Sequence, residues 1–142
     1  MHDFMTKKIT FLVFSMLIAG LALANSSLLK AEEIVGVKVA EKAEIGKYLT
    51  DGKGITLYRF ANDTEGVSNC TGDCLVNWPA FYVDPAAVVE GCEASDFGII
   101  KREDGGEQTT YKGMPLYYFI NDNTPGDTNG HGLKDVWYVV TP

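Results

Sequence analysis

One loop near the C-terminal end of the chain carries the densest set of possible metal ligands. Asp122, Asp127 and Asn129 could supply side-chain oxygens there, and backbone carbonyls could add more. Oxygen donors of this kind suit calcium. The loop departs from the EF-hand pattern, because Thr124 and Gly126 occupy positions where that pattern has acidic or amide side chains. The alternative is a long turn in which Asn, Asp and Gly only satisfy the backbone geometry.

Three residues with softer ligand atoms suggest a second metal hypothesis. His131 and Met114 are the histidine and the methionine that remain after the N-terminal segment is excluded, and Cys92 adds a thiol. A mixed set of this type suits copper. The three residues would have to converge in space, which sequence spacing does not show, so copper ranks behind calcium.

Two further cysteines, Cys70 and Cys74, enclose a short segment that contains Gly72. An oxidising compartment favours a disulfide between them. Zinc is the rival, but a single pair of cysteines without a second ligand pair is weak evidence for it. We therefore expect a Cys70–Cys74 bridge, which leaves Cys92 as a free thiol or as a competitor for one of the other two.

Patterns typical of enzymes are scarce. A histidine–cysteine or histidine–serine pair would have to use His131, and no nucleophile elbow accompanies it. No haem-attachment motif and no phosphate-binding glycine loop is present in the sequence. We therefore name no catalytic and no cofactor-binding residue, and an enzyme remains the least favoured class of function.

The N-terminal 24 residues have the features of a secretory signal peptide. A basic start at Lys7 and Lys8 precedes an apolar run from Ile9 to Leu23, and Ala22 and Ala24 form a small-residue cleavage site. The run is shorter than the roughly 18 to 20 residues that span a membrane. We expect cleavage before Asn25, a periplasmic or secreted location, and no stable membrane insertion afterwards.

The negative net charge of the chain after the N-terminal segment disfavours anionic partners. Residues 25–142 carry 10 basic and 18 acidic side chains, a net charge of −8. Repulsion disfavours nucleic acid and anionic lipid. An envelope protein or polymer is the expected partner.

The mature chain is a tandem repeat. Sliding the sequence by 59 positions aligns eight identical residues within 26 ungapped positions, where ordinary composition gives roughly one or two. The shared motif residues are Tyr58, Phe60, Asp63 and Trp78 in the first copy and Tyr117, Phe119, Asp122 and Trp137 in the second. Each half would be marginal alone, so we expect one domain over residues 34–142, with repeats at about 34–83 and 97–142, after a flexible leader at 25–33.

Short β-rich runs separated by glycine-rich turns position these motifs. Each half is predicted to hold a three-stranded meander, a polar loop and a closing strand that carries its tryptophan. The expected strands are residues 34–39, 45–50, 55–60 and 75–79 in the first half, and 97–102, 107–111, 115–120 and 136–140 in the second. Residues 85–90 could form one helical turn after Asp84. This pattern predicts an all-β fold of two pseudo-symmetric meanders sharing one core, either a sandwich or a partly closed barrel.

Alternation along each motif strand predicts which side chains are buried together. Tyr58 and Phe60 face one side of the first motif strand, and their copies Tyr117 and Phe119 do the same in the second. We expect these rings to stack in the shared core. The aspartate after each motif strand, Asp63 or Asp122, should accept backbone N–H bonds from the next turn, with a metal or substrate carboxylate pair as the alternative.

At these residues the chain resembles the bacterial secreted-repeat family, described as predicted lipoproteins with a Y-x-[FWY]-x-x-D motif. The similar segments are residues 54–63 and 70–79 in the first unit, and 110–119, 125–130 and 136–140 in the second. The resemblance implies a bacterial exported protein, often at the cell envelope, with no established activity. The chain differs from the family's pattern in lacking a lipidated cysteine, in having Cys92, and in having His131 in its second loop.

These observations favour a non-catalytic exported β module that is structural or binds a partner. The first alternative is a metal-binding protein of the periplasm or exterior, with calcium ahead of copper. The second alternative is an enzyme of unknown class.

Overall fold

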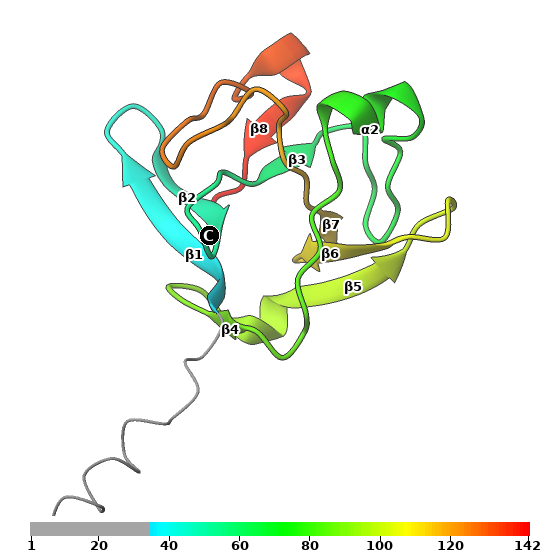
Figure 1. The fold of residues 1–142 in the computed structure, drawn as a ribbon, viewed down its shortest axis with the longest axis horizontal. Helices are drawn as coiled ribbons and strands as arrows, with labels where there is room; N and C mark the ends of the chain where they lie inside the picture. The colour runs from blue at the N-terminus through cyan, green and yellow to red at the C-terminus, as the bar shows by residue number, and fades with distance from the viewer. Residues whose placement is uncertain (1–34) are drawn as a thin grey trace, which may run out of the picture. The chain divides into compact units, whose positions relative to one another are not determined.

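The computed structural model describes residues 35–142, which form mostly short strands, with a small amount of helix at the edge of the strands (Figure 1). The predicted signal peptide at 1–24 and the predicted leader at 25–33 lie outside the described residues. Within residues 35–142, no helix has the length and apolar character needed to cross a membrane.

The first sheet has the order β2-β1-β4. β1 (Val35–Lys42) pairs antiparallel with β2 (Gly46–Asp51), with Val39 opposite Leu49. β4 (Val88–Val89) runs parallel to β1 on its other side. The two strands predicted at 34–39 and 45–50 are confirmed.

A second, two-stranded sheet joins the repeats. β3 (Tyr58–Phe60) belongs to the first repeat and pairs antiparallel with β8 (Trp137–Val139) of the second. In this register Phe60 lies opposite Trp137. The motif strand of one repeat is therefore paired with the closing strand of the other.

The third sheet has the order β5-β6-β7 and belongs to the second repeat. β5 (Phe97–Lys101) and β6 (Glu107–Tyr111) form an antiparallel hairpin, and β7 (Met114–Pro115) pairs with the far edge of β6. The predicted strands at 97–102 and 107–111 are confirmed. The predicted strand at 115–120 is largely irregular, because Tyr117 and its neighbours pair with the first repeat instead.

Backbone hydrogen bonds run in both directions between the two motif segments and join the repeats. The Tyr58 amide donates to the Tyr117 carbonyl at 2.8 Å, and the Tyr117 amide donates to the Tyr58 carbonyl at 2.9 Å. The second motif segment also pairs with the segment after Trp78, since the Tyr118 amide donates to the Pro79 carbonyl at 2.8 Å. Each motif strand thus lies between elements of the opposite repeat.

The closing strand predicted at 75–79 is wrong. Helix α2 (Asp73–Asn77) occupies most of that segment, and the Trp78 amide caps it by donating to the Cys74 carbonyl. Gly72 precedes α2 with a φ of 56°, a conformation that glycine adopts without steric cost. The chain becomes extended only from Pro79 onward, where it pairs with the second motif segment.

The helical turn predicted at 85–90 is correct only in its first part. The Asp84 carboxylate accepts a hydrogen bond from the Ala86 amide at 2.8 Å, as a capping residue should. Val88 and Val89 then leave the turn and form β4. Their branched side chains favour the strand beside β1 over a helix.

Both repeats contribute to the core, as predicted, but it consists of two clusters. The first holds Tyr48, Tyr58, Cys70, Trp78, Tyr117, Phe119, Trp137 and Val139. The second holds Val37, Leu49, Leu57, Phe81, Tyr111, Leu116 and Val140. Neighbouring residues can belong to different clusters: Leu57, just before β3, packs in the second cluster and Tyr58, at the start of β3, in the first. The three sheets are small and separate, and they do not close into one barrel.

Candidate functional site

The repeat motif converges at one place, the contact between the two repeats. We call this region the seam and define it as the following eight residues. They are Tyr58, Phe60, Asp63, Trp78, Tyr117, Phe119, Asp122 and Trp137.

Four rings of the seam form a continuous stack. The indoles of Trp78 and Trp137 lie face to face at its centre, with centroids 3.8 Å apart and planes 4° from parallel. Phe60 covers the outer face of Trp137 at 4.3 Å, and Phe119 covers that of Trp78 at 4.3 Å. Each phenylalanine therefore stacks on the tryptophan of the opposite repeat.

The two motif tyrosines contact the stack edge-on. Tyr58 meets Trp78 at 5.4 Å and 77°, and Tyr117 meets Trp137 at 5.2 Å and 88°. Edge-to-face pairs of this kind stabilise a core by about 0.5–1.5 kcal/mol each beyond the area that they bury. The tyrosine and phenylalanine rings of the motif share one core cluster, as predicted, but they do not stack on one another as expected. The phenylalanines stack on the tryptophans, and the closest tyrosine–phenylalanine pair of the motif among the described residues, Tyr58 and Phe119, meets edge-on at 6.2 Å.

A hydrogen bond from each tyrosine to the opposite repeat flanks the stack. The Tyr58 hydroxyl donates to Oδ2 of Asp122, and the Tyr117 hydroxyl donates to Oδ2 of Asp63 at 2.6 Å. Both carboxylates are nearly inaccessible, with 6 % of Asp63 and 7 % of Asp122 exposed. Each motif aspartate therefore holds the tyrosine of the other copy.

The second oxygen of each carboxylate binds its own loop. Oδ1 of Asp63 accepts from the Asn69 amide at 2.6 Å, and Oδ1 of Asp122 accepts from the Asn129 amide at 3.0 Å. This is the turn-forming role predicted for the two aspartates. The equivalence also reaches the asparagine side chains, which donate to the carbonyls of Asn62 and Asn121. That asparagine match escapes the ungapped alignment, because the second loop is one residue longer.

The buried environment shifts proton affinities in the seam. Burial raises the pKa of Asp63, although the Tyr117 hydroxyl, the Asn69 amide and the Arg102 charge oppose this shift. Burial and the hydrogen bond to Asp122 raise the pKa of Tyr58, and burial and the hydrogen bond to Asp63 raise that of Tyr117. Both phenols remain protonated far above neutral pH.

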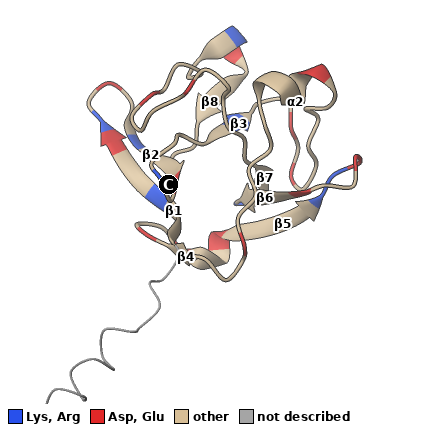
Figure 2. Cartoon of the chain, in the orientation of Figure 1, with Lys and Arg blue, Asp and Glu red and all other residues tan. Residues whose placement is uncertain are grey.

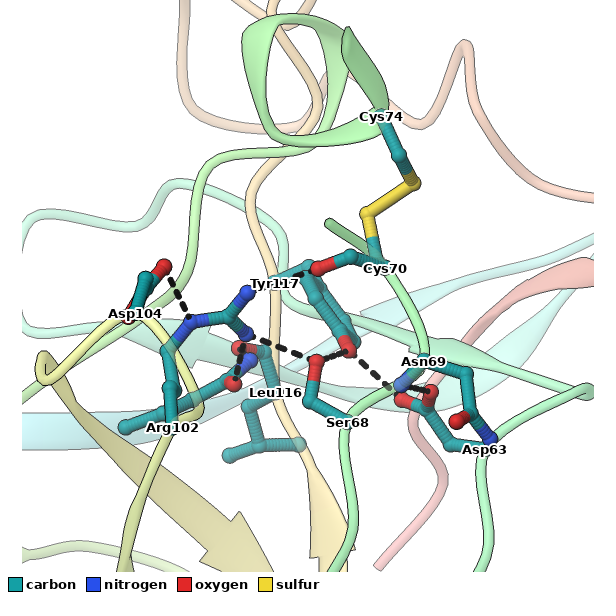
Figure 3. Close-up of a disulfide and its surroundings, with 10 residues drawn as sticks. Asp63, Ser68, Asn69, Cys70, Cys74, Arg102, Asp104, Leu116 and Tyr117 are labelled. Atoms are coloured by element: carbon teal, nitrogen blue, oxygen red, sulfur yellow. Dashed lines mark hydrogen bonds and ion pairs between the residues drawn. A yellow bond between two sulfur atoms is a disulfide. The ribbon is translucent and has the colours of Figure 1, made fainter. Parts of the chain in front are cut away.

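A buried arginine extends one side of the seam (Figure 3). Arg102 donates to Oγ of Ser68 at 2.7 Å, to Oε1 of Gln108 at 2.6 Å and to the Cys70 carbonyl at 2.6 Å. Ser68 in turn shares a hydrogen bond with the Tyr117 hydroxyl at 2.6 Å. Sequence reasoning missed Arg102 and Ser68, because they lack counterparts in the repeat and an arginine after a strand normally points to solvent.

The predicted disulfide is confirmed. Cys70 and Cys74 are bridged, with Cα atoms 5.3 Å apart, and the bridge ties the loop after Asp63 to α2 (Figure 3). Cys92 is a free, half-buried thiol. Burial raises its pKa, and the negative charges of Asp96 and Glu93 add to the shift. A raised pKa disfavours the reactive thiolate.

The two aspartates predicted to bind calcium make different hydrogen bonds, Asp122 within the seam and Asp127 within its own loop. Asp122 binds Tyr58 and the Asn129 amide within the seam. Oδ2 of Asp127 accepts from the amides of Asn123 at 3.0 Å and Thr124 at 3.1 Å, and these bonds lower its pKa. Among residues 35–142 no three His, Cys, Asp or Glu side chains are grouped to hold a metal. Calcium binding therefore stays a prediction that these contacts do not favour.

The residues of the copper hypothesis make separate contacts. Nδ1 of His131 accepts a hydrogen bond from the Val139 amide at 3.1 Å, and its ring meets Tyr138 edge-on. Cys92 packs against the second core cluster. Met114 lies in β7, beside β6. Copper binding likewise stays a prediction without support from these contacts.

A small apolar hollow lies apart from the seam, between the first and third sheets. Its volume is about 70 Å³. The lining comes mainly from Gly36, Val83, Ala87, Val89, Phe97 and Ile99. Thr109 in its wall already accepts the Val83 amide at 2.9 Å. The hollow is therefore mainly apolar, with Asp84 and Thr109 as the polar side chains in its wall.

Comparison with known families matches both halves of this arrangement. A family model described as a secreted repeat of unknown function matches residues 39–82 and again residues 98–141, together more than half of the chain. No curated protein and no solved structure matched the chain. The two matched segments contain the two motif copies that meet at the seam. The chain therefore belongs to the family of secreted repeats of unknown function.

Proposed function

We propose that the mature protein is a non-catalytic module of the bacterial periplasm or outer envelope that acts by binding another envelope component. The repeat motif holds the two halves together, and the surface carries the interaction. If the surface contacts an envelope polymer and not a protein, the role of the module would be structural.

The proposal rests on one observation: the carboxylates of the motif make all their hydrogen bonds to groups within the protein. Both oxygens of Asp63 and of Asp122 accept hydrogen bonds from protein donors. Within residues 35–142 no buried side-chain nitrogen or oxygen lacks a partner. Catalytic acids, bases and nucleophiles instead need an atom that faces a substrate. The motif is therefore best explained as architecture.

The surface supports a partner that is neutral or basic. Acidic and basic side chains are interspersed over the outer strands and loops (Figure 2), and acidic ones predominate in the sequence. Val76 on α2 is 62 % exposed and Ile120 is 48 % exposed. Their segments are adjacent, since the Ile120 amide donates to the Asn77 carbonyl at 2.9 Å. We expect contact at these two exposed apolar side chains on adjacent segments.

Site-specific crosslinking in intact cells tests the proposal. A photoreactive residue at Val76 or Ile120 should yield a defined adduct with an envelope protein or polymer, and one at Lys53, in an exposed turn, should not. The exported protein should also be recovered with its N-terminus at Asn25. Equal crosslinking at all three positions, or none at any, would contradict the proposed contact site.

A further inference from the structure

We propose that the seam is a buried one-electron relay, in which the stacked tryptophans accept an oxidising equivalent and the two tyrosines quench it by releasing a proton to the opposite aspartate. This activity goes beyond partner binding and does not depend on it. The evidence is the placement of oxidisable rings and proton acceptors in one dry cluster.

The tryptophan pair provides the site of oxidation. Indole is among the side chains most readily oxidised by one electron, and two parallel indoles at 3.8 Å can share the resulting positive charge. Trp78 is 5 % exposed and Trp137 is 3 % exposed, and the stacked phenylalanines cover their outer faces. Water is therefore largely excluded from the place where the charge would reside.

The tyrosines provide the electron that reduces the oxidised tryptophan pair. Each lies edge-on against one indole, at 5.4 Å for Tyr58 and 5.2 Å for Tyr117. An oxidised phenol is a strong acid, so a tyrosine gives up its electron readily only when a base can take its proton. Asp122 and Asp63 are such bases, because each already accepts the hydroxyl hydrogen bond.

The proposed sequence balances in atoms and charge. A one-electron oxidant of the inorganic-radical class takes one electron from the tryptophan pair and is reduced. Tyr58 or Tyr117 then passes one electron to the tryptophan cation, and its O–H bond breaks as the proton moves to Oδ2 of Asp122 or Asp63. The products are a neutral tryptophan pair, a neutral tyrosyl radical and a carboxylic acid. An external reductant of the thiol class later returns one electron to the tyrosyl radical, and the proton moves back from the aspartate to the tyrosine oxygen. The thiol releases its own proton to solvent and becomes a thiyl radical, so the tyrosine and the carboxylate are both restored.

The two halves of the seam make this relay redundant. Tyr58 with Asp122 and Tyr117 with Asp63 are equivalent pairs on opposite sides of the stack. Ser68, which accepts a hydrogen bond from Arg102, contacts Tyr117 in the second pair, while the Gly130 amide donates to the Tyr58 hydroxyl in the first. We therefore expect tyrosyl radicals at both positions.

Pulse radiolysis with the azide radical on the full mature chain tests the proposal. The tryptophan radical absorbance should decay in a first-order step, independent of protein concentration, while the tyrosyl radical absorbance grows. The step should be slower in heavy water. In the double variant Asp63→Asn with Asp122→Asn, the amide oxygen can still accept the tyrosine hydrogen bond, while the NH2 group faces the loop amide that the carboxylate bound. Because an amide is a far weaker base, conversion should slow by about tenfold or more.

Two matched controls make the outcome decisive. Asp127→Asn removes a loop carboxylate outside the seam, and Tyr82→Phe removes an exposed tyrosine, so neither should change the rate.

If near-ultraviolet circular dichroism shows that the double asparagine variant is unfolded, Tyr58→Phe with Tyr117→Phe keeps all the rings and should leave a long-lived tryptophan radical. Conversion at the original rate in a folded seam variant, or no conversion in the unaltered protein, would overturn the relay.

Discussion

Trp78 and Trp137 are 59 residues apart in the chain, yet their indole rings stack face to face with centroids 3.8 Å apart. Each is the same position of its own repeat. Around them, the phenylalanine and the aspartate of one repeat engage the tryptophan and the tyrosine of the other. Neither half can make these stacking contacts and hydrogen bonds alone. This explains why two copies of a short repeat form one folded unit.

The hydrogen bond between Tyr117 and Asp63 should contribute measurably to stability. Asp63→Ala removes the acceptor of the Asn69 amide and the carboxylate partner of the Tyr117 hydroxyl, which keeps only Ser68. A buried group left unpaired costs about 1–3 kcal/mol. A double-mutant cycle with Tyr117→Phe should give a coupling energy of about 0.5–3 kcal/mol by urea denaturation. The exposed Glu44→Ala should change stability by no more than about 0.5 kcal/mol. Strict additivity of the two seam substitutions would show that the pair does not interact.

Alkaline pH should destabilise the fold through its buried phenols. Burial and carboxylate partners raise the pKa of Tyr58, Tyr117 and Tyr118 in the folded state. Above the ordinary value of about 10, the unfolded chain ionises while the folded chain keeps these protons, so stability falls as pH rises. Each such group adds up to about 1.4 kcal/mol per pH unit to the slope. Tyr118→Phe should therefore flatten the curve of unfolding free energy against pH, and an unchanged slope would contradict the assignment.

The Cys70–Cys74 bridge should stabilise the domain modestly. It closes a loop of about five residues, which corresponds to about 2 kcal/mol in the chain-entropy model. Non-reducing peptide mapping should identify this pair and leave Cys92 free. Cys70→Ala with Cys74→Ala should lower the melting temperature, whereas Cys92→Ser should leave the pairing intact. A crosslinked peptide containing Cys92 would refute the connectivity in solution.

Calcium should have little effect on stability. Binding to the folded state at a hundredfold excess over Kd would stabilise by about 2.7 kcal/mol. The oxygens of Asp122 and Asp127 already accept protein donors, so a metal would have to displace them. Melting curves in millimolar calcium and in EDTA should nearly coincide. A rise with calcium that disappears in Asp127→Ala would instead establish the loop as a calcium site.

Local pattern was sufficient for most of the strands and for the disulfide. Short β-rich runs located β1, β2, β5 and β6, because these hairpins form between neighbours in the chain. The motif alignment also identified the seam residues as a group. Shared motif positions tend to be equivalent in space, and here that equivalence is a stack.

The errors arise where tertiary contacts override local pattern. Residues 75–79 look like a closing strand, but the nearby disulfide and Gly72 lead into α2. The crossed pairing of β3 with β8 could not be read from the repeat, since either copy offers the same partners. The burial of Arg102 could not be predicted for a related reason, because two of its acceptors, Ser68 and the Cys70 carbonyl, lie in a loop of the other repeat.

The central claim is that the two repeats are interdependent halves of one cooperative unit. Equilibrium unfolding of the mature protein in urea, followed by tryptophan fluorescence and by far-ultraviolet circular dichroism, tests it most directly. We predict one transition with coincident midpoints, and a loss of about 3–5 kcal/mol in Trp137→Ala that unfolds both halves together. Two resolved transitions, or a Trp137→Ala variant whose first repeat stays folded, would contradict the claim.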